Sequence, residues 1–110
     1  MICRVWRGWT TPQNAQAYER VVRGEVIPGI EARRIFGFRH IDLMRREMGD
    51  EVEFTTLMWF DSLEAIVAFM GEDYEVSHVP SAAQALLKRY DERAAHNHVL
   101  DRRPQGDDRT

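Results

Sequence analysis

The stretch from Val52 to Ala65, VEFTTLMWFDSLEA, determines most of the fold that the sequence predicts. Its first nine residues, Val52–Phe60, are rich in β-branched and aromatic side chains and therefore favour a strand. Residues 61–64, DSLE, have the pattern of a capping box in which Asp61 caps a helix. Gly71 is expected to end this helix. Its apolar face is expected at Leu63, Ile66, Val67 and Met70.

Apolar side chains occupy both faces of the predicted Val52–Phe60 strand, which alternate along the chain. One face would carry Glu53, Thr55, Leu57 and Trp59, and the other would carry Phe54, Thr56, Met58 and Phe60. Neither set has the composition of a solvated face, so both faces of the sheet need a cover. Helices can cover one face. A second copy of the chain is the economical cover for the other, and the sequence therefore predicts a homodimer.

Periodicity and turn residues predict the remaining elements. We expect a strand over 2–10 and a helix that begins after Thr11 and is stopped by Pro28-Gly29. An irregular crossing over 29–36, a strand over 37–47 and a hairpin connection over 48–51 follow. A short helix from Pro80 and a last strand over 93–100 complete the domain. This order predicts an α+β domain over 1–100, a ferredoxin-like βαββαβ fold with a four-stranded antiparallel sheet. Residues 101–110 are polar and aperiodic, which predicts a disordered tail.

Composition narrows the classes of function. The chain has 110 residues and a net charge of −3, and its arginines are scattered, so no basic stripe suggests a nucleic-acid partner. Its apolar runs are far shorter than the roughly 20 residues that span a bilayer, which argues against a membrane partner. Cys3 is the only cysteine, and the N-terminus lacks the pattern of a signal peptide, so we expect a cytoplasmic protein.

The junction from Trp59 to Ala65 resembles the W-x-[DS]-x-x-x-A strand-to-helix junction of antibiotic-biosynthesis-monooxygenase-like domains. The resemblance covers residues 1 to about 100 and implies a dimeric α+β barrel with a pocket between the sheet and the helices of each subunit. Members of that superfamily include cofactor-independent oxygenases of aromatic polyketides, haem-degrading enzymes and domains with no assigned activity. Trp59 resembles the Trp that lines the oxygenases' pocket. The haem-degrading branch has a His on the following helix, where this chain has Ala68-Phe69-Met70.

Five residues are candidates for binding a small molecule: Trp59, Trp6, Arg4, His40 and His78. Trp59 would provide a stacking wall for a flat ligand, and its alternative role is a core aromatic at a strand end. Arg4 shares a strand face with Trp6, where a cation is costly unless it is paired or faces a ligand. It would neutralise an acidic ligand or form a salt bridge with Glu53. His78 lies in the loop that usually rims the pocket, and His40 lies on an edge strand.

Three further residues are candidates for catalysis: His96, His98 and Tyr74. His96 and His98 project from one face of the predicted last strand, and either would serve as a base that titrates near neutrality. The alternative to this catalytic role is that His96 and His98 are two half-exposed histidines near a chain end. Two histidines at this spacing can also begin a metal site, but no third ligand follows, so we expect no metal.

The sequence contains no Ser-His-Asp set, phosphate-binding glycine loop or cofactor fingerprint, and we expect no cofactor. The resemblance and the aromatic surplus favour a monooxygenase that acts without a cofactor on a flat apolar or aromatic molecule. The main alternative is a non-catalytic domain of the same fold that binds a small ligand or only dimerises. Haem binding is a third and less favoured hypothesis.

Overall fold

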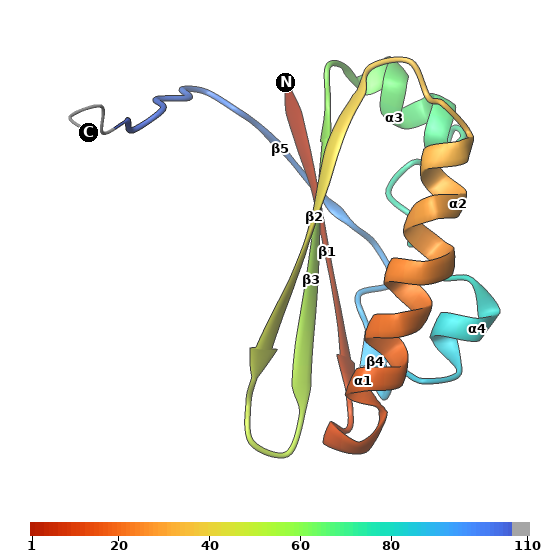
Figure 1. The fold of residues 1–110 in the computed structure, drawn as a ribbon. Coiled ribbons are helices and arrows are strands. Elements are labelled where there is room, and N and C mark those ends of the chain that lie inside the picture. The colour runs from red at the N-terminus through yellow and green to blue at the C-terminus, as the bar shows by residue number, and fades with distance from the viewer. Residues whose placement is uncertain (107–110) are drawn as a thin grey trace.

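A computed structural model describes residues 1–106 and confirms the predicted α+β fold, an antiparallel sheet with helices on one of its faces (Figure 1). The elements follow in the order β1 (Ile2–Thr10), α1 (Pro12–Val21), the π-helical turn η1 (Val22–Val26), α2 (Ile27–Ala32), β2 (Phe38–Glu47), β3 (Val52–Phe60), α3 (Leu63–Met70), α4 (Ser81–Gln84), β4 (Arg89–Tyr90) and β5 (Ala95–His98). No helix of the described residues is long and apolar enough to cross a membrane.

The sheet has five strands, one more than the sequence predicts. β2 pairs with β3, β3 pairs with β1, and the short strands β4 and β5 both pair with β1 along its other edge. The predicted last strand over 93–100 is therefore too long. After Asp91, whose N–H still bonds to Arg7 O of β1 (2.9 Å), the chain bonds to the loop before α4, as the hydrogen bonds from Ser77 N to Glu92 O (3.0 Å) and from Ala94 N to Glu75 O (2.6 Å) show.

The first helix continues through Pro28-Gly29, where the sequence predicts its end. α1, η1 and α2 form one rod up to Ala32, so the first half of the predicted irregular crossing over 29–36 is helical (Figure 1). Pro28 lies in the first turn of α2, directly after the π-helical turn, in which Ile27 N–H bonds to Val22 O. A π-helical turn widens the backbone, and a proline in a first turn has no hydrogen bond to lose, so the rod tolerates Pro28.

The cap of α3 lies one residue later than the capping box predicts. Ser62, not Asp61, is the N-cap, and its hydroxyl accepts from Ala65 N–H at 3.3 Å. Asp61 instead accepts from Arg39 Nε at 2.7 Å. Gly71 ends the helix as predicted, with a φ of 91° that favours glycine. The buried residues of α3 are Ala65, Ile66 and Phe69, so Ile66 is as predicted, whereas the predicted Leu63 is exposed.

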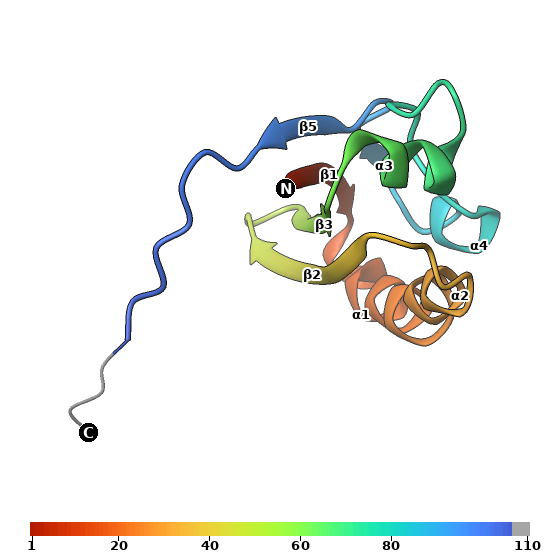
Figure 2. The same ribbon diagram turned by 90° about the horizontal axis from the view of Figure 1, so that it is seen from above.

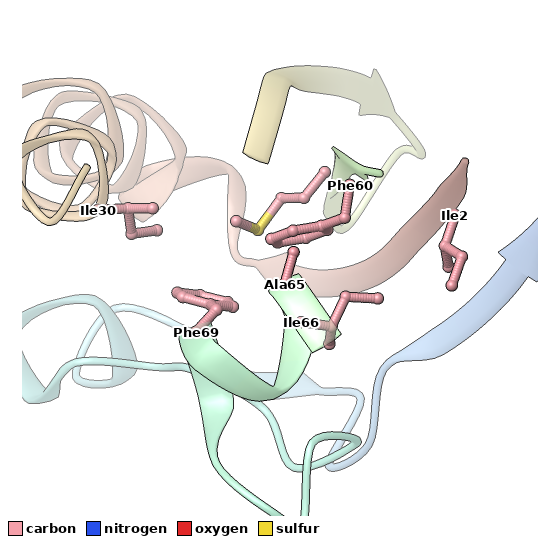
Figure 3. Packing of buried hydrophobic residues seen from close by; sticks show 7 residues of the cluster. Ile2, Ile30, Phe60, Ala65, Ile66 and Phe69 are labelled. Carbon is pink, nitrogen blue, oxygen red and sulfur yellow. The ribbon is translucent and has the colours of Figure 1, made fainter. Parts of the chain in front are cut away.

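The core lies between the sheet and the helical layer in two clusters. In one of them Ile30 of α2, Phe69 of α3 and Phe60 of β3 meet (Figure 3). The other cluster joins Tyr18 of α1 and Phe54 of β3, whose rings lie 4.8 Å apart. No helix of residues 1–106 lies on the opposite face of the sheet, as Figure 2 also shows, and we call it the open face.

Residues 101–106 have neither helix nor strand and lie exposed beyond β5. The predicted disordered tail over 101–110 begins with them, and its last four residues lie outside the described part of the chain.

Candidate functional site

A pocket lies between the sheet and the helices, at the junction of the two core clusters. Its cavity measures about 50 Å³ and opens to solvent at one end. This is well below the roughly 300–1,000 Å³ of small-molecule sites, so a bicyclic ligand would need side chains at the mouth to move. It is lined by Arg4, Trp6, Tyr18, Val22, Val26, Ile27, Ile30, Ile41, Thr56, Met58, Phe69, His78, Val79, Pro80 and Ala83.

Arg4 is the charged residue most deeply buried in this pocket, with only 3% of its surface exposed. Its Nη1 donates to the carbonyl oxygen of Tyr74 and lies 3.0 Å from Nε2 of His96, and its Nη2 donates to the carbonyl oxygen of Val76 at 2.8 Å. Burial lowers the pKa of Arg4 to about 10, so the guanidinium is still charged at neutral pH. Two carbonyl groups and an imidazole thus fix a fully charged guanidinium in place.

The predicted salt bridge between Arg4 and Glu53 is absent because the two side chains lie on opposite faces of the sheet. Arg4 is paired with Met58, whereas Glu53 is paired with Trp9 on the open face. The predicted shared face of Arg4 and Trp6 is confirmed, since both line the pocket.

His96 and Tyr74 lie behind Arg4 and do not line the pocket themselves. An arginine donates only, so Nε2 of His96 must accept from it, which places the proton of a neutral ring on Nδ1. That Nδ1 is buried and has no hydrogen-bond partner among the described residues. Burial and then the charge of Arg4 lower the pKa of His96, which favours the neutral ring. The ring of Tyr74 packs edge-on against His96 at 5.2 Å. Both residues therefore position Arg4.

His78 and Trp6 also line the pocket. His78 lies at the rim, 5.3 Å from the ring of Phe69, and partial burial with the charges of Arg33 and Arg4 lowers its pKa. A neutral imidazole at a pocket rim can accept a proton. Trp6 is fixed by its indole N–H, which donates to the carbonyl oxygen of Asp91 at 2.7 Å and to Ser77 Oγ at 3.0 Å.

The position of Trp6 depends on Gly8. A Cβ atom at residue 8 would lie 2.8 Å from Cη2 of Trp6 and 2.9 Å from Cδ2 of Leu87. Gly8→Ala should therefore lower the free energy of unfolding by about 1–3 kcal/mol, as overpacking does, measured by urea denaturation. Gly24→Ala in η1 is the control, because its new methyl group meets no atom within 4 Å; it should stabilise the helix by up to about 1 kcal/mol. A Gly8→Ala protein as stable as the wild type would contradict this packing.

Trp59 lies on the open face, so it does not line this pocket as the resemblance implies. It is paired with Cys3, and strand alternation points it away from its neighbours Met58 and Phe60. Its indole N–H donates to Asp42 Oδ2 at 3.0 Å, and the ring of His40 lies 5.4 Å away. Trp59 and His40 therefore form a second group, separated from the pocket by the sheet.

His98 joins neither group. It is exposed on β5, opposite Ile2, at the edge of the sheet. β2 and β5 lie at opposite edges of the sheet, so His40 and His96 do not meet within one chain. Among residues 1–106, no three His, Cys, Asp or Glu side chains gather as metal ligands would.

Solved structures share this fold. A putative antibiotic biosynthesis monooxygenase from Bacillus cereus matches with a TM-score of 0.64 and 14% identity, over 94% of this chain and 97% of that one. The protein Rv0793 from Mycobacterium tuberculosis matches with a TM-score of 0.59 and 19% identity, over 92% and 96% of the two chains. The ActVA-Orf6 monooxygenase of Streptomyces coelicolor, in complex with nanaomycin D, matches with a TM-score of 0.59 and 15% identity, over 96% and 92%.

The chain has the antibiotic biosynthesis monooxygenase fold. The resemblance that the Trp59–Ala65 junction suggests is thus confirmed for the fold, and identities of 14–19% carry no more than that. No family model and no curated protein sequence matches the chain.

Within this fold, sequence reasoning missed most of the apolar pocket wall. Thr56 and Met58 lie on the same sheet face as Arg4 and Trp6, and Tyr18 and Phe69 face them from α1 and α3. The sequence does indicate the strand residues of this wall, because Phe54, Thr56, Met58 and Phe60 alternate along β3 and therefore share one face. The register that joins this set to Arg4, Arg4↔Met58, is a long-range pairing that no local pattern specifies.

Proposed function

We propose that this protein is a cofactor-independent monooxygenase that acts on a flat apolar or aromatic phenol in the pocket beside Arg4. The observation that supports the proposal is the pocket itself: an apolar cleft between sheet and helices that is lined by the charged Arg4, by His78 and by the phenol of Tyr18, whose pKa burial raises. Apolar walls with a few convergent polar groups are typical of small-molecule sites.

The chemistry needs only the substrate, oxygen and these residues. His78 accepts the proton of the phenol, and the resulting anion, stabilised by the positive charge of Arg4, supplies the electrons that reduce dioxygen. For a phenol with a conjugated methylene carbon, as in anthrones, one oxygen atom forms the new carbonyl. The other leaves as water with the two hydrogens of that carbon. One phenol and one dioxygen thus give one quinone and one water.

Oxygen uptake tests this function. With an anthrone in air and no added cofactor, the wild-type protein should consume one dioxygen per quinone formed, above the protein-free background. His78→Gln should lower the rate by about 10²-fold, the order expected for loss of a general base. The readouts are an oxygen electrode and the absorbance of the quinone, with an anaerobic reaction as the control.

The same experiment distinguishes the proposed monooxygenase from the rival function, a non-catalytic binding domain. The small cavity of about 50 Å³ favours this rival, since it leaves little space for dioxygen beside a ligand. A protein that binds the anthrone but leaves the background rate unchanged would be such a domain.

The proposed assembly is a homodimer that packs through the open face. Val5 and Leu57 face each other across β1 and β3 on this face and are only half-buried, and Met44 of β2 is 47% exposed. Trp9 and Trp59 on the same face already lie under cations of their own chain, Arg89 at 3.9 Å and Arg102 at 5.0 Å from the ring centres. A second copy of the chain would cover the aliphatic side chains of Val5, Leu57 and Met44.

A further inference from the structure

Among residues 1–106, no carboxylate pairs with the buried positive charge of Arg4. Its partners in the described part of the chain are two backbone carbonyls and a neutral imidazole. The acidic residues of the neighbouring loops pair with other arginines: Asp73 and Glu75 with Arg93, and Asp91 with Arg7. A buried cation that lacks an anionic partner is costly, and carbonyl dipoles offset only part of that cost.

The geometry leaves part of the guanidinium free for a ligand. A guanidinium has five N–H donors in a planar fork. The contacts to Tyr74, His96 and Val76 occupy three of them. The Nε–H and one Nη2–H have no hydrogen-bond partner among residues 1–106, and Arg4 lines the pocket. Two donors of one fork are what a carboxylate or another oxyanion accepts in a bidentate manner.

The walls of the pocket define the rest of the ligand. Apart from Arg4 and His78, the lining consists of apolar and uncharged side chains, including Phe69, Trp6 and Met58. The guanidinium carbon of Arg4 lies 5.6 Å from the centre of the Phe69 ring, so the charge lies beside an aromatic wall. A flat ring would pack against these walls while an acidic group on its edge reaches the guanidinium.

We propose that the pocket selects flat aromatic ligands that carry an oxyanion, a carboxylate or an ionised phenol, and that Arg4 binds this group. The inference rests on the proposed function, because it names the ligand class of the same pocket. It extends the proposed function, in which Arg4 stabilises an ionised phenol, to a selection for charged over neutral ligands at the binding step, including ligands whose charge is a carboxylate.

A matched pair of probes tests the requirement. 2-Naphthoate and 2-naphthamide have the same ring and nearly the same shape, but only the first is charged at pH 7. Wild-type protein should bind 2-naphthoate more tightly by roughly 10–100-fold, the gain expected when one partner of a buried hydrogen bond becomes an anion. Arg4→Gln should remove this difference. Titration calorimetry at fixed ionic strength gives both dissociation constants.

Arg7→Gln is the matched control, because Arg7 lies on the same strand but on the open face and is half-exposed. It should retain the wild-type preference. If Arg4→Gln does not fold, Arg4→Met removes the charge while filling the space with hydrocarbon, and the same loss of preference is expected. Equal affinity of the wild type for the two probes, or a preference that survives at Arg4→Met, would overturn the inference and leave the proposed function standing. If neither probe nor an anthrone binds, the proposed function is wrong and the inference falls with it.

Discussion

Replacing Ala83 with phenylalanine should abolish the binding of flat aromatic ligands, with a loss of affinity of at least roughly a hundredfold. Ala83 is buried, 3% exposed, and its methyl group forms part of the pocket wall where α4 approaches α1. The cavity measures only about 50 Å³, so an added phenyl ring takes the space that a ligand ring needs. Fluorescence titration with 2-naphthol measures the change, and quinone formation from an anthrone should be lost in parallel.

The neighbouring residue provides the control for this substitution. Ala82 lies on the same helix turn but is exposed, so Ala82→Phe adds an equal ring outside the pocket and should leave affinity unchanged. Overpacking at residue 83 should cost about 1–3 kcal/mol of stability, which urea denaturation would show. If Ala83→Phe folds and still binds 2-naphthol with wild-type affinity, the ligand site lies elsewhere.

Local patterns predicted the elements best where both ends carried a turn signal. The bounds of β3, Val52–Phe60, agree with the prediction because Gly49-Asp50 precedes the strand and a capped helix follows it. The end of the first helix was wrong because Pro28 stops a helix only in its interior, and here a π-helical turn places it in a first turn. That turn depends on how the helix packs against the sheet, which the local sequence does not specify.

The positions of the candidate site residues follow from the sequence only in part, and the differences share one cause. Arg4 and Trp6 were placed correctly on one face because strand alternation is a local rule. Trp59 was assigned to the pocket by its resemblance to a family position, and the register Cys3↔Trp59 sets it on the open face. The approach of His96 to Arg4 likewise follows from the pairing Arg4↔His96, between residues far apart in the chain. Long-range register decides the site, and no pattern in a single sequence encodes it.

The largest expected change in assembly comes from Leu57 at the centre of the open face. At micromolar concentration, wild-type protein should sediment as a dimer of two 12.9 kDa chains, and Leu57→Arg should sediment as a monomer. In a face-to-face dimer the new arginine of each copy would be buried, and the carboxylate opposite it on β2, that of Asp42, already accepts from the Trp59 indole. We therefore expect a cost of several kcal/mol for each charge. Sedimentation equilibrium measures the mass directly, and circular dichroism shows whether the variant is folded.

Gln16→Arg is the control, because it adds the same charge on the exposed side of α1, away from the open face. It should remain dimeric. A wild-type monomer at micromolar concentration would contradict the dimer altogether, whereas a dimeric Leu57→Arg protein would place the interface on another surface. The pocket lies on the opposite side of the sheet, so a folded Leu57→Arg monomer should still bind 2-naphthol. Loss of binding in that monomer would mean that the partner subunit completes the pocket.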